Sequence, residues 1–178
     1  MTDFVVHDLE TAPEKSKTLL NSSIKNFGFI PNQSAVMAEA PTLLEAYQRA
    51  HELFIECSLA EEEKAIVWIC AGMAHSCDYT VCAHQFIAKS NAVPMEYLTA
   101  LKNNTPLPAK LEALRKFCRI VITCQGQINQ SDINDFIQAG FNKAQVFEVI
   151  LGVSQKTMSN IVNNIAGTLV DDMFKSNI

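Results

Sequence analysis

The chain has 178 residues, of which 48% are hydrophobic and 19% charged, and it carries a net charge of −5. This apolar share is enough to fill a core, which excludes a disordered chain, and the length predicts one domain over residues 1–178. The 14 Lys and Arg residues are scattered and outnumbered by acids, so neither a nucleic acid nor an anionic membrane is favoured as a partner.

No segment predicts export or membrane insertion. The opening residues, MTDFVVHDLETAPEK, carry acids where a signal peptide needs a basic start and an apolar run. The longest apolar stretches, AIVWICAGMA and VFEVILGV, are too short to span a bilayer. We therefore expect a soluble, cytoplasmic protein, in which most of the six cysteines are small buried hydrophobic side chains.

Helical spacing of apolar residues runs through the N-terminal half of the chain. The first predicted helix covers residues 14–28 and ends at Gly28, a suitable C-terminal residue. Two further helices are predicted over residues 32–40 and 41–56. Residues 59–76 begin with acids that suit the helix dipole and continue apolar on all sides, which predicts a buried central helix.

The C-terminal half continues this periodicity. A helix begins at or near Cys77 and runs to residue 90. Further helices are predicted at residues 95–102, 109–123 and 130–140. The third of these is capped by Ser131 or a neighbour and closed at Gly140, and Asn142 and Gln145 open a last long helix with capping-box spacing. Because no alternating strand pattern stands out, the predicted fold class is all-α.

The segment HSCDYTVCAH, residues 75–84, gathers two cysteines, two histidines and a tyrosine. If Cys77 lies in the first turn of its helix, Thr80 and His84 share its face at i+3 and i+7. Cys82, at i+5, points about 140° away, and its Cα lies more than about 7 Å from that of Cys77, beyond disulfide reach. The candidate chemical set is therefore Cys77, Thr80 and His84, with Cys82 packed on the opposite side.

A cysteine at a helix start is a candidate nucleophile, because free backbone N–H groups and the dipole favour its thiolate. We expect Thr80 to donate a hydrogen bond to Cys77, His84 to carry a proton to or from a leaving group, and Tyr79 to add a hydroxyl nearby. Each also has a purely structural explanation, since a lone helical cysteine is usually inert. A metal site is not favoured, because Cys77, Cys82 and His84 do not converge on one helix face, and no cofactor is predicted.

Three segments, in the same order along the chain, resemble the alkylhydroperoxidase D-like, or carboxymuconolactone decarboxylase, family. FGFIPN resembles its N-terminal GxxPN signature, and residues 59–84 resemble its core segment with C-x-Y-C-x-x-x-H. Residues 139–167 resemble its C-terminal helix, whose asparagine matches Asn160. The resemblance covers nearly the whole chain and implies a compact, multi-helix domain that assembles into homo-oligomers, from dimers to hexamers.

The resemblance also implies residue roles. Its redox members use a Cys-x-x-Cys pair, a histidine and a glutamate to reduce hydroperoxides, with a thiol donor regenerating the disulfide. Its decarboxylase members act on a carboxylated lactone without the pair. Cys77 matches the first cysteine, Tyr79 the common tyrosine and His84 the histidine. Two positions depart from the motif, because Thr80 replaces the second cysteine and Ala65 the glutamate.

The first functional hypothesis is a thiol-dependent oxidoreductase of the antioxidant, peroxidase or peroxiredoxin type. A hydroperoxide would oxidise Cys77 to sulfenic acid, and an external thiol or a second cysteine, with Cys124 as one candidate, would restore it. His84 would carry the proton. Glu63 lies two residues from the vacant glutamate position and on another side of its helix, so it is a poor substitute.

Two alternatives stay open. A non-redox enzyme would use His84 as general acid or base on a small carboxylated substrate, as in the decarboxylase branch. Against it, no cluster of arginines stands out to hold the carboxylate, and Arg49 and Arg115 are candidates only if they fold inward. The other alternative is a non-catalytic helical oligomer that kept the scaffold and lost the relay. A lowered Cys77 pKa, measured by thiol alkylation against pH, favours redox chemistry, whereas the free-thiol value of about 8.5 favours the non-catalytic oligomer.

Overall fold

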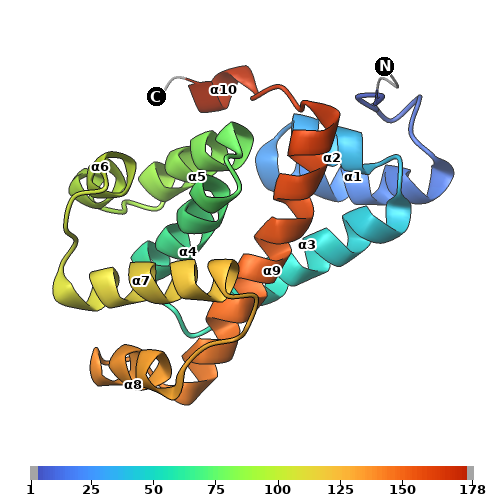
Figure 1. Ribbon diagram of the computed structural model, residues 1–178. Helices are drawn as coiled ribbons and strands as arrows, with labels where there is room; N and C mark the ends of the chain where they lie inside the picture. The colour runs from blue at the N-terminus through green and yellow to red at the C-terminus, as the bar shows by residue number, and fades with distance from the viewer. Residues whose placement is uncertain (1–3, 176–178) are drawn as a thin grey trace.

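The structure is a computed structural model, and it describes residues 4–175. Every regular element in that range is a helix, so the predicted all-α class is confirmed (Figure 1). Within it the helices are α1 (Glu14–Phe27), α2 (Asn32–Met37), α3 (Pro41–Ile55), α4 (Glu61–Ala74), α5 (Asp78–Ser90), α6 (Met95–Asn103), α7 (Ala109–Thr123), α8 (Gln130–Gln138), α9 (Lys143–Ala166) and α10 (Asp172–Lys175). None of these helices is both long and apolar enough to cross a membrane.

The ends of the helices follow local chemistry, as predicted. Gly28 takes the left-handed conformation after α1, with φ 81°, which glycine adopts without steric cost. At the start of α9, Asn142 and Gln145 each accept the other's backbone N–H, at 3.0 and 2.9 Å. One predicted cap is wrong: Ser131 lies inside α8, and Asn129 precedes that helix. The four-residue α10 was not predicted, because it is too short to have an apolar period of its own.

Helix α4 is the centre of the fold and packs against α5, α7 and α9. All of its residues from Glu63 to Gly72 are buried, which confirms the predicted central helix. Close packing of α3, α4 and α9 depends on Gly152 of α9. A Cβ there would lie 2.5 Å from the Phe54 ring and 2.8 Å from Val67 Cγ1, closer than packed atoms tolerate.

Helix α9 runs through the middle of the molecule, from α8 to the C-terminal segment (Figure 1). It packs against α2, α3, α4, α5 and α7. Its C-terminal half carries a group of buried polar side chains: Gln155, Lys156, Ser159, Asn160 and Asn163. Buried polar groups need partners, so these residues identify a region with a polar interior.

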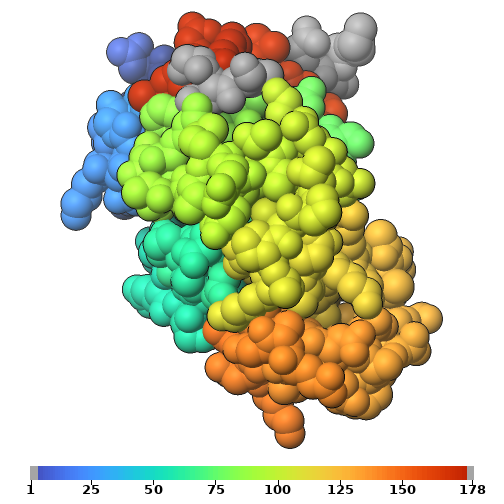
Figure 2. Space-filling model, turned by 90° about the vertical axis from the view of Figure 1, so that its left-hand side faces the viewer, coloured from blue at the N-terminus to red at the C-terminus, as the bar shows by residue number. Residues whose placement is uncertain are grey.

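The C-terminal segment folds back over the start of α5, at the top of the face shown in Figure 2. Phe174 of α10 is buried, and its ring lies 6.2 Å from that of Tyr79 and 5.4 Å from that of Phe86. The Asp171 carboxylate accepts hydrogen bonds from the Tyr79 hydroxyl, at 2.6 Å, and from the Asn32 backbone N–H, at 3.1 Å. The segment is therefore held by both apolar and polar contacts.

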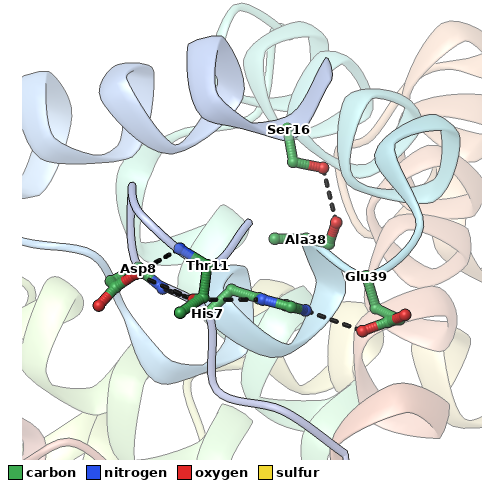
Figure 3. A network of polar contacts seen from close by, with 6 residues as sticks. All are labelled: His7, Asp8, Thr11, Ser16, Ala38 and Glu39. Carbon is green, nitrogen blue, oxygen red and sulfur yellow. Dashed lines mark hydrogen bonds and ion pairs between the residues drawn. The ribbon is translucent and has the colours of Figure 1, made fainter. Parts of the chain in front are cut away.

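The N-terminal residues are tied to the end of α2 by a polar network (Figure 3). His7 Nε2 lies 2.8 Å from the Glu39 carboxylate, and the Ser16 hydroxyl donates to the Ala38 carbonyl at 2.6 Å. Asp8 closes a turn by accepting two backbone N–H groups, at 2.9 and 2.8 Å. The network fixes α2, which forms one wall of a cavity in the interior.

Candidate functional site

A cavity of about 70 Å³ lies among α1, α2, α3, α5 and α9, and the C-terminal segment closes it on one side. Its polar lining includes Thr80 and His84 from α5, Tyr47 and His51 from α3, and Lys156 from α9. This volume holds a few water molecules or a small ligand. The cavity therefore combines room for a small molecule with groups able to bind it and transfer protons.

Cys77 occupies the N-cap position of α5, as predicted, but its side chain is only 1% exposed and does not line the cavity. Its Sγ lies 3.5 Å from Thr80 Oγ1, and the Asn163 side-chain amide donates to the sulfur at 3.8 Å. Thr80 both contacts the sulfur and lines the cavity. The predicted neighbours Cys77 and Thr80 are thus brought together, with Thr80 as the link to the cavity.

The hydrogen bond between Cys77 and Thr80 runs opposite to the expected direction. The Asn160 amide donates to the Ala71 carbonyl at 3.0 Å, so its Oδ1 is the atom that accepts from the Thr80 hydroxyl, at 2.6 Å. A hydroxyl has one proton, which Thr80 gives to Asn160. Thr80 is left to accept from the Cys77 S–H, and Asn163 is the group that donates to the sulfur.

The place of Thr80 depends on a glycine in the neighbouring helix. A Cβ added at Gly72 of α4 would lie 2.9 Å from Thr80 Cγ2 and 3.2 Å from Val81 Cγ2. These distances are shorter than packed side chains accept. Gly72 therefore lets the first turn of α5 approach α4, which brings the Thr80 hydroxyl within reach of α9.

His84 lies in the cavity wall and packs on Trp68, with the ring centroids 4.5 Å apart. Burial, together with the charges of Lys156 and His51, holds its pKa well below the ordinary value, so its ring is neutral at pH 7. Its Nδ1 is buried and has no hydrogen-bond partner among residues 4–175. His84 forms no hydrogen bond with Cys77 in the described chain, so the two predicted site residues are connected only through Thr80 and the cavity.

The cavity wall also contains Tyr47, His51 and Lys156, which were not predicted as site residues from the sequence. Lys156 is only 1% exposed, and its Nζ donates to the Tyr47 hydroxyl at 2.9 Å. Nζ also lies 5.1 Å from the Tyr47 ring centroid and 5.9 Å from that of Trp68, and the His51 ring stacks between these two rings. One signal was available, because Lys156 stands one helical turn before Asn160, on the same face of the helix.

The charge of Lys156 acts on its neighbours in the cavity. Burial, reinforced by this charge, lowers the pKa of His51 to about 3. Burial alone would raise the pKa of Tyr47, but the charge of Lys156 and the hydrogen bond from its Nζ lower it below its ordinary value. At neutral pH the cavity therefore holds neutral imidazoles and a tyrosine whose anion is stabilised.

The other predicted residues have different surroundings. The Tyr79 ring lines the cavity, but its hydroxyl donates to Asp171 and so binds the C-terminal segment. Cys82 is buried, and burial raises the pKa of its thiol. Cys124 is exposed at the end of α7 and forms no contact with Cys77 among the described residues. All six cysteines are free thiols.

Glu63 does not fill the vacant glutamate position, as expected. Its carboxylate accepts the Ala60 backbone N–H at 2.9 Å, which caps α4, and it pairs with Lys110 at 2.7 Å. Ala65 is buried in the main apolar core. No carboxylate therefore takes over this position from α4.

The two arginines considered as carboxylate ligands do not line the cavity. Arg49 pairs with Glu52 at 3.0 Å, and Arg115 pairs with Glu112 on α7. The cation that does face the cavity is Lys156. Within residues 4–175, no group of three or more His, Cys, Asp or Glu side chains is placed to hold a metal ion.

Comparisons with known proteins find similarity in structure. No family model and no curated protein matches the sequence. An uncharacterized peroxidase-related protein from Ralstonia eutropha JMP134, with an alkylhydroperoxidase AhpD core, aligns with a TM-score of 0.81 and 20% identity, over 95% of this chain and 92% of that one. A second uncharacterized peroxidase-related protein, from Silicibacter sp. TM1040, aligns with a TM-score of 0.80 and 16% identity, over 98% of this chain and 96% of that one.

The debrominase Bmp8 is similar to the same degree. A cysteine-to-alanine variant of it, in complex with 2,3,4-tribromopyrrole, aligns with a TM-score of 0.82 and 15% identity, over 99% of this chain and 96% of that one. The same values hold for its structure without ligand. Sequence identity is low in all of these pairs, so what they share with this chain is the fold.

Proposed function

We propose that this chain, which has the alkylhydroperoxidase D-like fold, is a thiol-dependent oxidoreductase that reduces a small hydroperoxide bound in the cavity. The observation that carries the proposal is the position of Thr80. Thr80 contacts Cys77 Sγ at 3.5 Å and lines the cavity together with His84. Only the Thr80 side chain therefore separates the sulfur from a molecule bound in the cavity. The peroxidase-related neighbours of the same fold add support.

In the proposed reaction, Cys77 loses its proton and the sulfur attacks the terminal oxygen of the hydroperoxide. The S–O bond forms as the O–O bond breaks, which gives a sulfenic acid and an alkoxide that takes up a proton and leaves as the alcohol. An external thiol then displaces water and forms a mixed disulfide. A second thiol releases Cys77 as the thiol, and the reductant leaves as its disulfide.

An external reductant follows from the positions of the other cysteines. Cys82 belongs to the same buried cluster as Cys77, but five residues along the intact helix α5 put it beyond disulfide reach, and Cys124 is exposed at the end of α7. Attack also requires the Thr80 side chain to rotate away from the sulfur. This breaks its 2.6 Å hydrogen bond to Asn160, a net cost of about 0.5–1.5 kcal/mol.

Substitution of Cys77 by serine tests the proposal. With an alkyl hydroperoxide and a dithiol reductant, we expect Cys77→Ser to lose peroxide consumption by about 100-fold or more, because the reaction has no other nucleophile at this position. Cys124→Ser is the matched control, since that thiol is exposed and away from Cys77, and its rate should equal the wild-type rate. Unchanged consumption in Cys77→Ser would contradict the proposal.

A non-redox reaction at His84 is the second candidate. It is favoured by the cavity wall, which contains His84, Tyr47 and Lys156 but not Cys77. Lys156 would then hold the anionic group of a carboxylated substrate, the role first considered for the arginines. This candidate predicts that Cys77→Ala keeps its turnover of such a substrate while His84→Gln loses it, the opposite of the thiol proposal.

A further inference from the structure

The proposed reduction needs a proton donor, and the usual candidates in the cavity are poor ones. The leaving alkoxide must be protonated, but the position that the resemblance assigns to a relay glutamate is the buried Ala65. Burial, with Lys156 beside them, holds the pKa values of His51 and His84 low, so both rings lack the second proton of an imidazolium at pH 7. A different group has to supply the proton.

Tyr47 and Lys156 form a buried pair in the same cavity wall. Tyr47 is 8% exposed and Lys156 1%, and the lysine Nζ donates to the hydroxyl oxygen at 2.9 Å. Lys156 has no ion pair with a carboxylate anywhere in residues 4–175, so its charge is balanced only by this oxygen and by the faces of Tyr47 and Trp68. A buried cation without an anion stabilises any negative charge that develops beside it.

No group in residues 4–175 accepts a hydrogen bond from the Tyr47 hydroxyl, so this hydroxyl can donate its proton to a bound molecule. Its oxygen accepts from Lys156, and a lysine ammonium is a donor only, so the phenolic proton does not go to Lys156. Tyr79, the other tyrosine of the cavity, differs in this respect, because its proton goes to Asp171 at 2.6 Å. Of the two phenols in the cavity wall, only Tyr47 can deliver a proton to a bound molecule without breaking an existing bond.

We propose that Tyr47 is the proton donor of the cavity and that Lys156 is a positioning residue, which stabilises the tyrosinate left after proton transfer. The inference rests on the proposed function for its acceptor, the alkoxide released when the O–O bond breaks. The alkoxide takes the phenolic proton and leaves as the alcohol. Tyr47 then regains a proton from solvent, which balances the one that Cys77 released before its attack.

The ionisation of the two phenols agrees with this assignment. Burial raises the pKa of Tyr47, but the charge and hydrogen bond of Lys156 bring it below its ordinary value of about 10. Burial and Asp171 raise the pKa of Tyr79. The titratable groups around the cavity are Lys156 from α9, His51 and Glu52 from α3, and His84 and Tyr79 from α5.

Tyrosinate absorbance measured against pH tests the pair without using enzyme activity. The protein has three tyrosines, so single variants assign each transition. We expect one tyrosine to titrate below about pH 10 in the wild type, to vanish in Tyr47→Phe, and to move up by at least about one pH unit in Lys156→Met. Lys156→Arg keeps the charge and should restore most of the shift. Tyr97→Phe is the control, and it should leave the low transition in place.

Peroxide reduction then tests the catalytic role. We expect Tyr47→Phe to lower kcat by about 100-fold at little change in KM, and the fall of the rate at high pH to disappear with it, because a general acid contributes at least about this factor. Lys156→Met should shift that fall to higher pH. Cys77→Ser should abolish peroxide reduction and keep the low tyrosine transition. If the proposed function is wrong, Cys77→Ser keeps its peroxide reduction; if the Tyr47–Lys156 pair is wrong, the low tyrosine transition is missing from the wild type.

Two results would overturn the assignment. One is a wild-type protein in which all three tyrosines titrate at or above pH 10. The other is Tyr47→Phe with the wild-type kcat and pH profile. Circular dichroism establishes whether Tyr47→Phe is folded. If Tyr47→Phe is not folded, the two lysine variants test the assignment instead. If the low tyrosine transition lies at the same pH in Lys156→Met and Lys156→Arg, the charge of Lys156 does not act on Tyr47, and the assignment is contradicted.

Discussion

At the scale of single residues, Thr80 is the side chain that lies between Cys77 and the cavity. It stands where the motif of the similar family has a second cysteine, and its hydroxyl is shared between Asn160 and the Cys77 thiol. Because the threonine proton goes to Asn160, the sulfur receives no hydrogen bond from this side. Thr80 therefore lies between the Cys77 thiol and the cavity.

Replacing this residue by cysteine should create a redox pair. Thr80→Cys places a second thiol three residues after Cys77 and on the cavity wall, within the range of a disulfide at a helix start. We expect hydroperoxide treatment to remove two reactive thiols, and peroxide turnover with a dithiol to rise by about tenfold or more, because an internal thiol replaces an external one. Thiol counting and a coupled peroxidase assay measure both effects.

The control for this substitution is Thr80→Ser. It keeps the hydroxyl and its bond to Asn160, so turnover should stay at the wild-type level. If Thr80→Cys still holds all its thiols after oxidant treatment, the first turn of α5 does not bring positions 77 and 80 within disulfide reach.

The sequence was sufficient for the part of the site that lies on one helix. Cys77, Thr80 and His84 follow from helical spacing, and Cys77 does lie at the helix start. The direction of the Thr80 hydrogen bond was not accessible, because Asn160 on α9 determines it from 80 residues away. Lys156 was missed for a similar reason, since only the packing of α3 against α9 brings it to Tyr47.

At the scale of helices, the contact between α4 and α5 has almost no free space at Gly72. Gly72→Ala adds a methyl group 2.9 Å from Thr80 Cγ2. We expect the free energy of unfolding to fall by about 1–3 kcal/mol through overpacking, reduced by about 1 kcal/mol from the better helix propensity of alanine. Urea denaturation measures the change, and a loss of peroxide turnover should accompany it because Thr80 is displaced.

Gly152→Ala provides the comparison. A Cβ there meets the Phe54 ring at 2.5 Å, a shorter distance and against a rigid ring, so this variant should lose more stability than Gly72→Ala. It does not displace Thr80 directly. If Gly72→Ala keeps both wild-type stability and wild-type turnover, α4 and α5 are not in close contact at this position.

Element boundaries were predictable wherever a local signal exists. Gly28 and the Asn142–Gln145 pair end and begin helices as expected, since caps depend on residues close in sequence. The C-terminal α10 was not predictable, because its four residues are helical only where Phe174 packs on α5. Tertiary contact, rather than local propensity, determines that element.

At the scale of the whole molecule, the buried histidines make stability depend on pH. His51 has a pKa of about 3 in the folded protein and His84 one well below normal, whereas both titrate near 6.5 when unfolded. Between about pH 6.5 and pH 3 the unfolded state therefore binds more protons, so the free energy of unfolding falls as the pH falls. The loss reaches about 1.4 kcal/mol per pH unit for each histidine.

Urea midpoints at pH 7.5 and pH 5 measure this effect. We expect His51 to contribute a loss of about 2 kcal/mol at pH 5 and His84 a further loss, so the loss should be smaller in His51→Gln, which cannot titrate. Equal stability at the two pH values would show that these histidines are not neutral and buried in the folded protein.

Self-association into two to six copies stays a prediction. The last turns of α9 and the residues after them expose several apolar side chains, with Ile161 48%, Ile165 67% and Leu169 77% exposed. A surface of this kind is a candidate subunit contact. Light scattering should give a multiple of the 19.7 kDa chain mass, and Ile165→Glu should lower that multiple. A wild-type mass of one chain would contradict the expectation.

The single carboxylate of Asp171 joins α2, α5 and the C-terminal segment, because it accepts from both Asn32 and Tyr79. Cleavage of the backbone between α9 and α10 by a protease would detach Asp171 and Phe174 from the rest of the chain together. A shielded sulfhydryl would then become open to solvent and to alkylating reagents. Proteolytic trimming at this site would therefore change the reactivity of Cys77 while leaving the central helices intact.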